Sequence, residues 1–290
     1  MTALVAAPSI TLPASADVQA IIRLALAEDI GRGDLTTEAT VPAGATATAE
    51  VLQKAPGVLC GLPVVEAVFA AIDPRVQIER CMDEGTYSNT RRATVARIEG
   101  PAAAILSGER TALNFLQRLS GVATISHKAR QLVEGTRATV IDTRKTTPGL
   151  RVLEKYAVRI GGATNHRAGL DDGFLIKENH IRAAGGITNA VRAAQMRAAP
   201  GQLVEVEVTS LDELDEALGA GAPLILLDNF STDLMRSAVA QTNGRARLEA
   251  SGGITLDNLA EVARTGVDFI SLGALTHSAG VLDFSLEVLV

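Results

Sequence analysis

Short apolar runs alternate with helical patterns along the second half of the chain. The apolar runs, rich in β-branched residues, lie at residues 139–141, 173–176, 204–208, 224–227, 248–250 and 269–272. A weaker candidate strand covers residues 158–163. Helical patterns lie between the strands, at residues 188–197, 211–218, 232–241 and 256–264. This alternation is typical of a parallel sheet. It predicts about seven strands in a closed or nearly closed β/α barrel, with a doubly wound open sheet as the competing topology.

The first half of the chain lacks this regular rhythm. Helices are predicted at residues 16–28 and 63–72, and strands at residues 46–54 and 94–99. Two separate helices are then predicted, at residues 102–119 and 122–133. Strands and helices that do not alternate strictly indicate an α+β unit. The sequence therefore predicts an α/β protein in which an N-terminal α+β sandwich-like domain precedes an incomplete barrel.

The predicted strands of the second half end in residues that do not belong in a hydrophobic core. These strand ends are Asp142-Thr143-Arg144-Lys145, Lys177-Glu178-Asn179-His180, Asp228-Asn229, Ser251-Gly252-Gly253 and Gly273-Ala274. Within residues 203–208, Glu205 and Glu207 occupy alternate positions and point to one face. Because the carboxyl ends of parallel strands meet at one edge, we expect a shared site there.

Charge is distributed unevenly along the chain. Residues 142–182 contain eight Lys or Arg against five acids, whereas the whole protein has a net charge of −6. An acidic protein with cations gathered in one segment is suited to a small, highly charged anion. We expect neither nucleic acid nor a membrane as a partner.

Two glycine-containing loops are candidates for phosphate binding. Residues 251–255 (SGGIT) lead from a predicted strand into a helix, and residues 272–276 (LGALT) repeat the arrangement after the last strand. Backbone N–H groups at a helix N-terminus bind phosphate, and glycine permits close approach. A plain turn is the commoner explanation for either loop alone, and the pairing of the two favours phosphate.

Charged side chains at the strand ends supply the remaining chemistry. Glu207 and Asp228 are candidates to hold Mg²⁺ or ribose hydroxyls, or to form a salt bridge with Lys145 or Lys177. An anion cluster is predicted from Arg144, Lys145, His166, Arg167 and Lys177. For His166 alone, a structural role is as frequent as a ligand-binding one.

Other positively charged residues are interpreted as structural. Arg151, Lys155 and Arg159, at spacings of four, are expected on the solvated face of a helix. Arg110, on a helix with apolar neighbours, could equally pair with Glu109 or a carbonyl.

Targeting signals and metal motifs are not evident. The N-terminal stretch, residues 1–17, has no Lys or Arg and is expected to be a frayed tail rather than a signal peptide. Cys60 and Cys81 lie in apolar sequence, which favours reduced thiols in a cytoplasmic protein. No apolar run approaches the roughly 20 residues that span a bilayer. The four histidines lack zinc-binding spacing, and neither Walker nor Rossmann glycine motifs occur.

Several segments together resemble the quinolinate phosphoribosyltransferase family, whose activity is also called nicotinate-nucleotide pyrophosphorylase (carboxylating). They are EDIGRGDLTT (28–37), ERTALNFLQRLSG (109–121), DTRKTTPG (142–149), GGATNHRAGL (161–170), LIKENHI (175–181), VEVEV (204–208), LDNF (227–230), EASGGIT (249–255) and GALTHS (273–278). No single segment is specific, but they span nearly the whole chain in the family's order.

The resemblance implies an enzyme of de novo NAD biosynthesis. It would transfer phosphoribosyl from phosphoribosyl pyrophosphate to quinolinate with decarboxylation, giving nicotinate mononucleotide, pyrophosphate and CO₂. It implies an N-terminal domain of residues 1–116, a barrel of residues 117–283, and a return of residues 284–290 to the first domain. It also implies a homodimer in which Arg110 reaches the partner's active site, and Mg²⁺ bound with phosphoribosyl pyrophosphate and held partly by Glu207 and Asp228.

The resemblance carries over residue by residue to the expected site. The expected substrate-binding residues are Arg110, Thr143, Arg144, Lys145, His166, Arg167, Lys177, Glu207, Asp228, Ser251, Gly252, Gly253, Leu272, Gly273 and Ala274. The expected catalytic residues are Lys145, Lys177, Glu207 and Asp228, with Lys145 or Lys177 as the proton donor after decarboxylation.

Three other functions stay open at this point. One is a related phosphoribosyl transferase with another acceptor, such as a relative associated with molybdenum transport. A second is a barrel lyase or aldolase that forms a Schiff base on Lys145 or Lys177. The third is a binding protein for a phosphate ligand that has no turnover. Fold alone does not separate them.

Overall fold

The computed structural model describes residues 10–13 and 15–289 of the chain. They form two compact units. The first comprises the described residues up to 125, together with residues 147–162 and 279–289, and the second comprises residues 126–146 and 163–278. Most of the N-terminal stretch that was expected to be a frayed tail, residues 1–9 and residue 14, lies outside the described residues.

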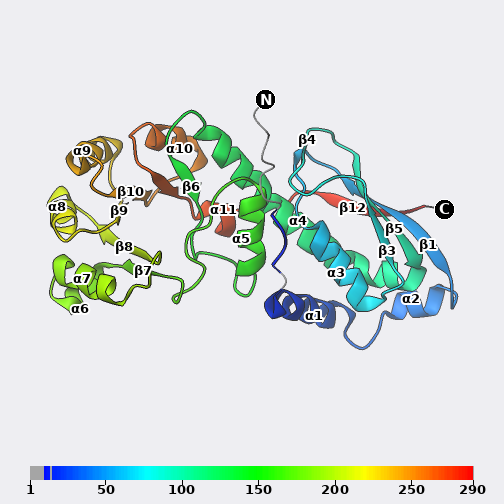
Figure 1. Ribbon diagram of the computed structural model, residues 1–290. Helices are drawn as coiled ribbons and strands as arrows, with labels where there is room; N and C mark the ends of the chain where they lie inside the picture. The colour runs from blue at the N-terminus through cyan, green and yellow to red at the C-terminus, as the bar shows by residue number, and fades with distance from the viewer. Residues whose placement is uncertain (1–9, 14, 290) are drawn as a thin grey trace, which may run out of the picture. The chain divides into compact units, whose positions relative to one another are not determined.

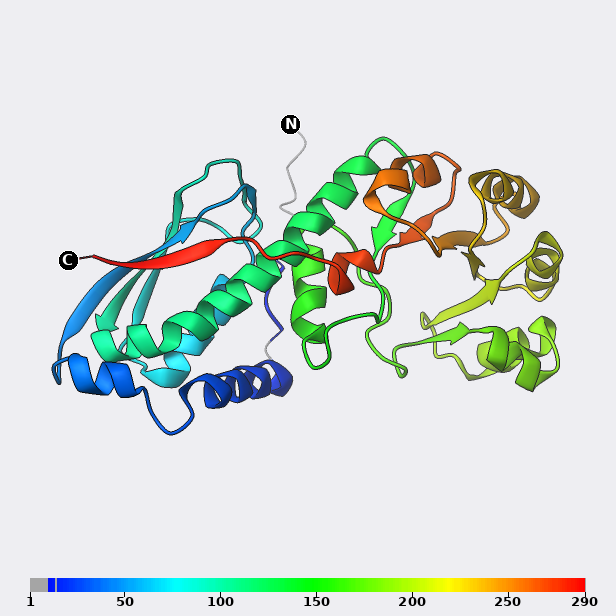
Figure 2. The ribbon, with the colours of Figure 1, turned by 180° about the vertical axis from the view of Figure 1, so that it is seen from behind.

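The first unit is built on a four-stranded antiparallel sheet in the order β12-β1-β5-β3. Its strands are β1 (Thr46–Gln53), β3 (Gln77–Arg80), β5 (Ala93–Pro101) and β12 (Phe284–Leu289). Figure 2 shows β12, the last strand of the chain, alongside β1, where Val51 is paired with Leu286. The C-terminal strand thus completes a sheet that the N-terminal half begins.

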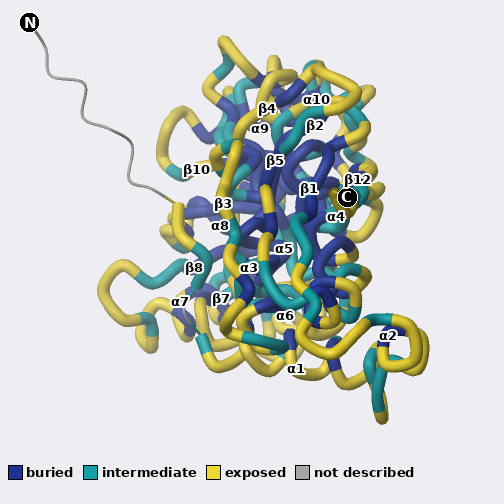
Figure 3. Tube along the Cα trace, turned by 90° about the vertical axis from the view of Figure 1, so that its right-hand side faces the viewer, coloured by how far each residue is buried: buried dark blue, intermediate teal, exposed yellow. Residues whose placement is uncertain are grey.

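Helices and a small second sheet complete the first unit. They are α1 (Ala16–Ile30), α2 (Leu35–Thr40), α3 (Leu62–Ile72), and the short paired strands β2 (Gly57–Val58) and β4 (Tyr87–Ser88). The spacing of Val64, Val65 and Val68 places their side chains on one face of α3, and all three are buried. Buried stretches also occur in β1 and β5, whereas the connecting loops are mostly exposed (Figure 3).

The two helices predicted at residues 102–119 and 122–133 are one continuous helix, α4 (Ala102–Leu132). The predicted break at Ser120-Gly121 is wrong because tertiary packing outweighs the low helix propensity of glycine. A Cβ atom at Gly121 would clash with the backbone carbonyl of Gly280, so the absence of a side chain lets the two segments approach.

We expect Gly121→Ala to destabilise the protein by about 1–3 kcal/mol, since the clash is with backbone that has no side-chain freedom to yield. Chemical denaturation measures the change. The matched control is Gly219→Ala at the end of α8 (Leu211–Gly219), where a Cβ would meet no atom within 4 Å. Equal stability of the two variants would contradict the packing argument.

The second unit confirms the predicted α/β fold. Its parallel sheet has the order β6-β11-β10-β9-β8-β7. The strands are β6 (Thr139–Ile141), β7 (Gly173–Ile176), β8 (Leu203–Val208), β9 (Leu224–Asp228), β10 (Arg247–Ser251) and β11 (Phe269–Ser271). Helices α6 (Glu178–Ala184), α7 (Ile187–Arg197), α8, α9 (Thr232–Thr242) and α10 (Leu256–Ala263) lie on the outer side of the curved sheet (Figure 1). The short helix α11 (Ala274–His277) follows β11.

The barrel is incomplete between β6 and β7. Thr164 makes a single parallel bridge to Ile141 at the position where a seventh strand would lie. The candidate strand at residues 158–163 is wrong, because residues up to Ile160 belong to helix α5 (Arg151–Ile160). A run of apolar residues this short fits either structure, and the helix buries its apolar face.

The basic face predicted for α5 is also wrong. Lys155 is only 5% exposed, and Arg159 is partly buried with Arg151. A long basic side chain can bury its methylene stem along apolar surface, so a spacing of four does not by itself identify a solvated face.

Among the described residues, no helix is both long enough and apolar enough to cross a bilayer. Cys60 and Cys81 are both free thiols. Cys60 is buried, but Cys81 is exposed, so the expectation of apolar surroundings is wrong for Cys81.

Candidate active site

A cavity of about 260 Å³ opens within the second unit at the C-terminal ends of its strands. Its lining is rich in charged and hydroxyl side chains. The lining residues are Asp142, Thr143, Arg144, Lys145, His166, Arg167, Leu175, Lys177, Leu226, Glu249, Ser251 and Ser271. The five cationic or imidazole residues predicted to form an anion cluster therefore line one cavity.

The loop after β6 is held in place by local hydrogen bonds. The Lys145 backbone N–H donates to Thr143 Oγ1 at 3.0 Å. The Thr276 hydroxyl, which is buried on α11, donates to the Lys145 carbonyl at 2.7 Å. Arg144 is half-buried and Lys145 is exposed. The loop thus presents two cations to the cavity from a fixed backbone.

The segment that carries His166 and Arg167 is anchored to β6. Asp142, fully buried, accepts a hydrogen bond from the His166 backbone N–H at 2.8 Å, and its own N–H donates to the Thr164 carbonyl at 3.0 Å. Arg167 Nη1 donates to the Gly173 carbonyl at 3.0 Å. Burial lowers the pKa of Arg167 from its usual value, and Arg144 adds to this effect by repulsion. Two neighbouring guanidinium groups therefore favour an anion between them.

Lys177 and Glu207 form an ion pair across β7 and β8. Lys177 Nζ lies 2.9 Å from Glu207 Oε2, with about half of the lysine side chain exposed. Lys177 also begins helix α6, where its backbone N–H donates to His180 Nδ1 at 3.0 Å. The salt bridge considered from sequence for Glu207 thus exists, and its partner is Lys177 rather than Lys145.

Asp228 ends β9 beside Ser251 of β10, with which it is in register. Its Oδ2 accepts a hydrogen bond from the side-chain amide of Asn229 at 2.8 Å. A Cβ at Gly252 would clash with the Asn229 side chain, and Gly252 has a φ of +91°. Glycine is therefore required where the two loops meet.

The two predicted phosphate loops differ in which of their residues are accessible to an anion. After Ser251-Gly252-Gly253, Thr255 caps helix α10, and the space beside Gly253 is open. In the second loop the Leu272 side chain is buried and its N–H already donates to the Ile141 carbonyl at 2.9 Å. Gly273 and Ala274, which begin helix α11, are partly exposed. An anion in this loop would contact Gly273 and Ala274 more readily than Leu272.

Arg110 is exposed on helix α4 within the first unit. It is the one predicted site residue outside the second unit.

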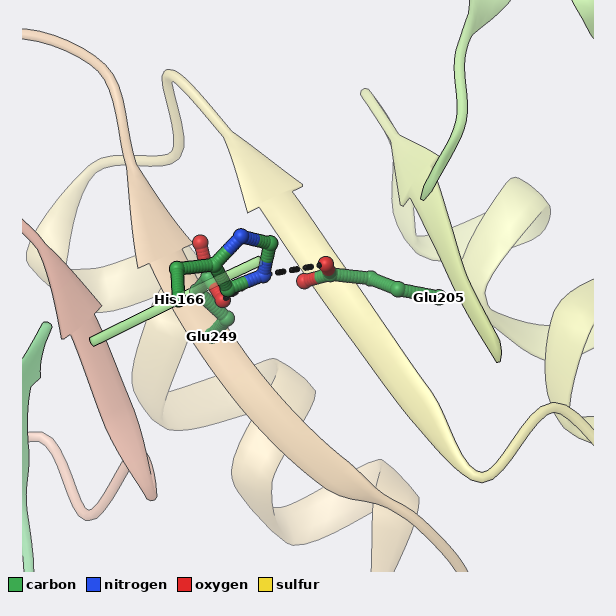
Figure 4. Close-up of side chains that lie close together, drawn as sticks. All are labelled: His166, Glu205 and Glu249. Carbon is green, nitrogen blue, oxygen red and sulfur yellow. Dashed lines mark hydrogen bonds and ion pairs between the residues drawn. The ribbon is translucent and has the colours of Figure 1, made fainter. Parts of the chain in front are cut away.

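His166, Glu205 and Glu249 form a cluster of side chains (Figure 4), and two of them, His166 and Glu249, line the cavity. His166 Nε2 lies 2.9 Å from Glu205 Oε2 and 3.7 Å from Glu249 Oε2. Both glutamates are almost fully buried. Burial raises the pKa of Glu205 to about 7. It raises the pKa of Glu249 well above its usual value, and the charge of Glu205 raises it further.

Sequence reasoning did not assign Asp142, Glu205 or Glu249 a role in the site. Glu205 was noted only for its alternation with Glu207. The usable signal was a charged residue inside or at the end of an apolar strand, since buried charges are rare unless paired.

The fold and the cavity together define a class of protein. A parallel β/α sheet gathers cations, two carboxylate strand ends and glycine loops at its C-terminal edge, as in barrel enzymes that bind phosphorylated, negatively charged substrates.

Comparison with known proteins identifies the family. Residues 34–120 match the quinolinate phosphoribosyl transferase N-terminal domain, and residues 122–287 match its C-terminal domain. The chain therefore belongs to the quinolinate phosphoribosyltransferase family.

Individual relatives agree along nearly the whole chain. A probable nicotinate-nucleotide pyrophosphorylase [carboxylating] of Bacillus subtilis is 44% identical over 261 residues, covering 90% of each chain. The nicotinate-nucleotide pyrophosphorylase [carboxylating] of Mycobacterium leprae is 44% identical over 275 residues, covering 92% of this chain and 95% of its own. The solved structure of the Francisella tularensis nicotinate-nucleotide pyrophosphorylase superposes with a TM-score of 0.91 at 40% identity, covering 98% of this chain and 100% of its own.

Proposed function

We propose that this protein transfers the phosphoribosyl group of phosphoribosyl pyrophosphate to quinolinate and releases CO₂, forming nicotinate mononucleotide for NAD biosynthesis. Family membership and the names of its relatives support the reaction. The observation that carries the assignment on this chain is the single cavity lined by Arg144, Lys145, His166, Arg167 and Lys177. A dicarboxylate needs more than one cation, and this number favours quinolinate over an acceptor with one carboxylate.

The residues divide between the two substrates. Arg144, Arg167 and His166 would orient the two carboxylates of quinolinate, with Thr143, Lys145 and Arg110 completing the site. The loops at Ser251-Gly252-Gly253 and at Leu272-Gly273-Ala274 would bind the phosphates of phosphoribosyl pyrophosphate through backbone N–H groups. Much of the rate enhancement would come from holding the ring nitrogen against the ribose C1 carbon.

Chemistry begins when the ring nitrogen bonds to C1 and the C1–O bond to pyrophosphate breaks. Positive charge develops on the ribose, and the carboxylates of Glu207 and Asp228 would stabilise it. The resulting pyridinium accepts the electron pair when the adjacent carboxylate leaves as CO₂. The carbanion at that ring carbon then takes a proton, for which Lys145 and Lys177 are the candidate ammonium donors.

Mg²⁺ is the metal that we propose for the pyrophosphate. Glu207 and Asp228 fit it, since they lie at or next to the C-terminal ends of β8 and β9, neither is fully buried, and carboxylate oxygens are the hard ligands that Mg²⁺ prefers. When bound, the ion would neutralise charge on the departing pyrophosphate.

A substrate comparison tests the proposal. The purified protein, Mg²⁺ and phosphoribosyl pyrophosphate are incubated with quinolinate or with nicotinate, and mononucleotide is quantified by chromatography. We expect product from quinolinate only. Turnover of nicotinate, or reduction of a carbonyl adduct on Lys145 or Lys177 by borohydride, would replace the assignment with a related transferase or with a Schiff-base enzyme. Phosphoribosyl pyrophosphate binding without any turnover would indicate a binding protein.

We also propose a cytoplasmic homodimer whose active sites are shared through Arg110. The exposure of Arg110 on α4 supports this, because an exposed arginine is available to a second subunit. Mixing Arg110→Ala with Glu207→Gln and allowing subunits to exchange tests it. In a mixed dimer one site carries both defects and the other carries neither, so we expect up to about a quarter of the wild-type activity to return. No recovery after confirmed exchange would show that Arg110 acts within its own subunit.

A further inference from the structure

A buried ion pair in the first unit lies outside the residues that the proposed reaction uses. It joins Arg118 of α4 to Glu154 of α5, with Arg118 Nη2 at 2.6 Å and Nε at 3.1 Å from Glu154 Oε1. The arginine side chain is 22% exposed and the glutamate side chain 0%. A charge buried this deeply is costly unless further hydrogen bonds satisfy it, so its other partners show what the pair holds in place.

The first segment that the pair holds is Thr147. Its backbone N–H donates to Glu154 Oε2 at 3.0 Å, and its hydroxyl donates to Glu154 Oε1 at 2.7 Å. The same hydroxyl accepts a hydrogen bond from Arg118 Nη2 at 3.3 Å. Thr147 directly follows residues 143–146, the acceptor loop, which contributes three residues to the cavity wall. The pair therefore fixes the end of this loop.

The second segment that the pair holds follows helix α11. Arg118 Nη1 donates to the Ala279 carbonyl at 2.8 Å. One turn of α4 makes a further contact with the same segment, since the Gln117 carbonyl accepts a hydrogen bond from the Leu282 N–H at 3.1 Å. Figure 2 shows the chain that leads into β12 passing across α4. Arg118 thus binds the chain shortly after the second of the two glycine loops.

These two segments are special in the path of the chain. Thr147 and Ala279 are the first residues of the first unit after each passage of the chain out of the second unit. One passage ends the acceptor loop, and the other follows residues 272–274, the second phosphate loop, and the short helix α11. A single arginine therefore binds both segments that emerge from the proposed substrate loops.

We propose that Arg118 and Glu154 are positioning residues for the transfer reaction. They fix the ends of the acceptor loop and of the second phosphate loop, and so set where the cations of the acceptor loop lie relative to the bound phosphates. This inference rests on the proposed function. Neither side chain needs to touch a substrate, because a displacement of about 1 Å in a group that binds substrate can cost about 10²-fold in rate.

An ion pair that contributes stability alone is the alternative. Replacing a buried ion pair by apolar side chains of similar volume is often neutral or stabilising. Such a replacement keeps the core filled but removes the hydrogen bonds to Thr147 and Ala279. The double variant Arg118→Met/Glu154→Met therefore separates the two roles.

The experiment compares this double variant with Arg118→Ala and with Thr147→Val, which keeps the backbone N–H and loses only the hydroxyl. The control is Val68→Ala, which shortens a fully buried side chain of α3 and alters none of these hydrogen bonds. For each variant, kcat and the KM of both substrates are measured at a temperature where thermal unfolding shows it to be folded.

Two further measurements do not depend on the stability of the variants. Arg118→Ala is assayed with guanidinium at a non-denaturing concentration, and with methylammonium as a cation that lacks the planar fork. The partial exposure of the Arg118 side chain lets a solute enter the space that alanine leaves. Hydrogen exchange of the backbone amides is followed in residues 143–150 and 274–281.

We expect Arg118→Ala to lower kcat/KM for quinolinate by about 10²-fold and to raise the KM of both substrates. The double variant should be at least as stable as Arg118→Ala and keep the same kinetic defect. Thr147→Val should raise the quinolinate KM about threefold to tenfold, as expected for the loss of one hydrogen bond. Guanidinium should restore activity to Arg118→Ala and methylammonium should not, while Val68→Ala keeps both wild-type KM values.

The inference is overturned by wild-type KM values in the folded double variant, which would leave the pair a role in stability alone. A lower kcat with both KM values unchanged, the sign of less folded enzyme, would also overturn it. So would equal effects of guanidinium and methylammonium on Arg118→Ala. If Arg118→Ala does not fold, Thr147→Val and the double variant decide by the same criteria.

Failure of the wild type to turn over quinolinate would refute the proposed function instead. Hydrogen exchange would still test the positioning role. Faster exchange in residues 143–150 and 274–281 of Thr147→Val and of the double variant, with the sheet of the first unit unchanged, would support it. Unchanged exchange in both segments would overturn it.

Discussion

We expect Glu207→Gln to lower kcat by about 10²–10³, the typical loss when one pre-positioned electrostatic group is removed from a transition state. Glu207 is the second-to-last residue of β8, its side chain is only 15% exposed, and a 2.9 Å ion pair with Lys177 holds its carboxylate in place. Glutamine keeps the size of the side chain but has no charge to stabilise the ribose cation. The change should appear mainly in kcat, since the charge develops only in the transition state.

Steady-state kinetics at saturating Mg²⁺ measures this effect, with Glu134→Gln as the exposed, charge-matched control. A wild-type kcat in Glu207→Gln, with only a higher KM for phosphoribosyl pyrophosphate, would assign Glu207 to ground-state binding alone. A titration with Mg²⁺ tests one further possibility, that a high metal concentration restores the kcat of Glu207→Gln.

Arg144→Ala should raise the quinolinate KM by about 10²-fold and lower turnover as well. A guanidinium binds a carboxylate with two parallel hydrogen bonds, and losing a charge-assisted pair of this kind costs about 2–4 kcal/mol. Arg144 is half-buried in the cavity wall beside Arg167, so its charge is less screened than that of a surface residue. The quinolinate KM of Arg144→Lys should lie between those of the wild type and Arg144→Ala, because lysine keeps the positive charge but cannot form the two parallel hydrogen bonds.

The control for this variant is Arg236→Ala on α9, where the arginine pairs with Asp233 on an exposed surface. Exposed pairs contribute about 0–1 kcal/mol, so neither activity nor stability should change much. Unchanged quinolinate kinetics in Arg144→Ala would remove this residue from the site.

The sequence predicted the barrel strands well because their signal is local. Short β-branched runs ending in polar residues predicted the bounds of the six observed strands to within a residue or two. The same feature located the cavity, since Arg144, Lys177 and Ser251 each lie at or just after a strand end. Parallel topology brings such ends together whatever their order in the chain.

The errors arose where long-range packing decides the structure. Gly121 was predicted to break a helix, but its lack of a side chain instead lets α4 pack against the backbone of Gly280. Lys155 was predicted to be solvated, but the packing of α5 buries it. Glu249 could be linked to His166 only after β8, β10 and the loop beyond Thr164 were arranged in space, because no spacing in the chain connects them.

The most direct test of the account is the fate of the acceptor's carboxylate. Quinolinate labelled in the carboxyl group next to the ring nitrogen is supplied with phosphoribosyl pyrophosphate and Mg²⁺, and labelled CO₂ and mononucleotide are counted in a single turnover. We expect one CO₂ per mononucleotide, and none when phosphoribosyl pyrophosphate is omitted, because the ring must be a cation before it loses the carboxylate. Release of CO₂ without the phosphoribosyl donor, or a mononucleotide that retains the label, would contradict the account.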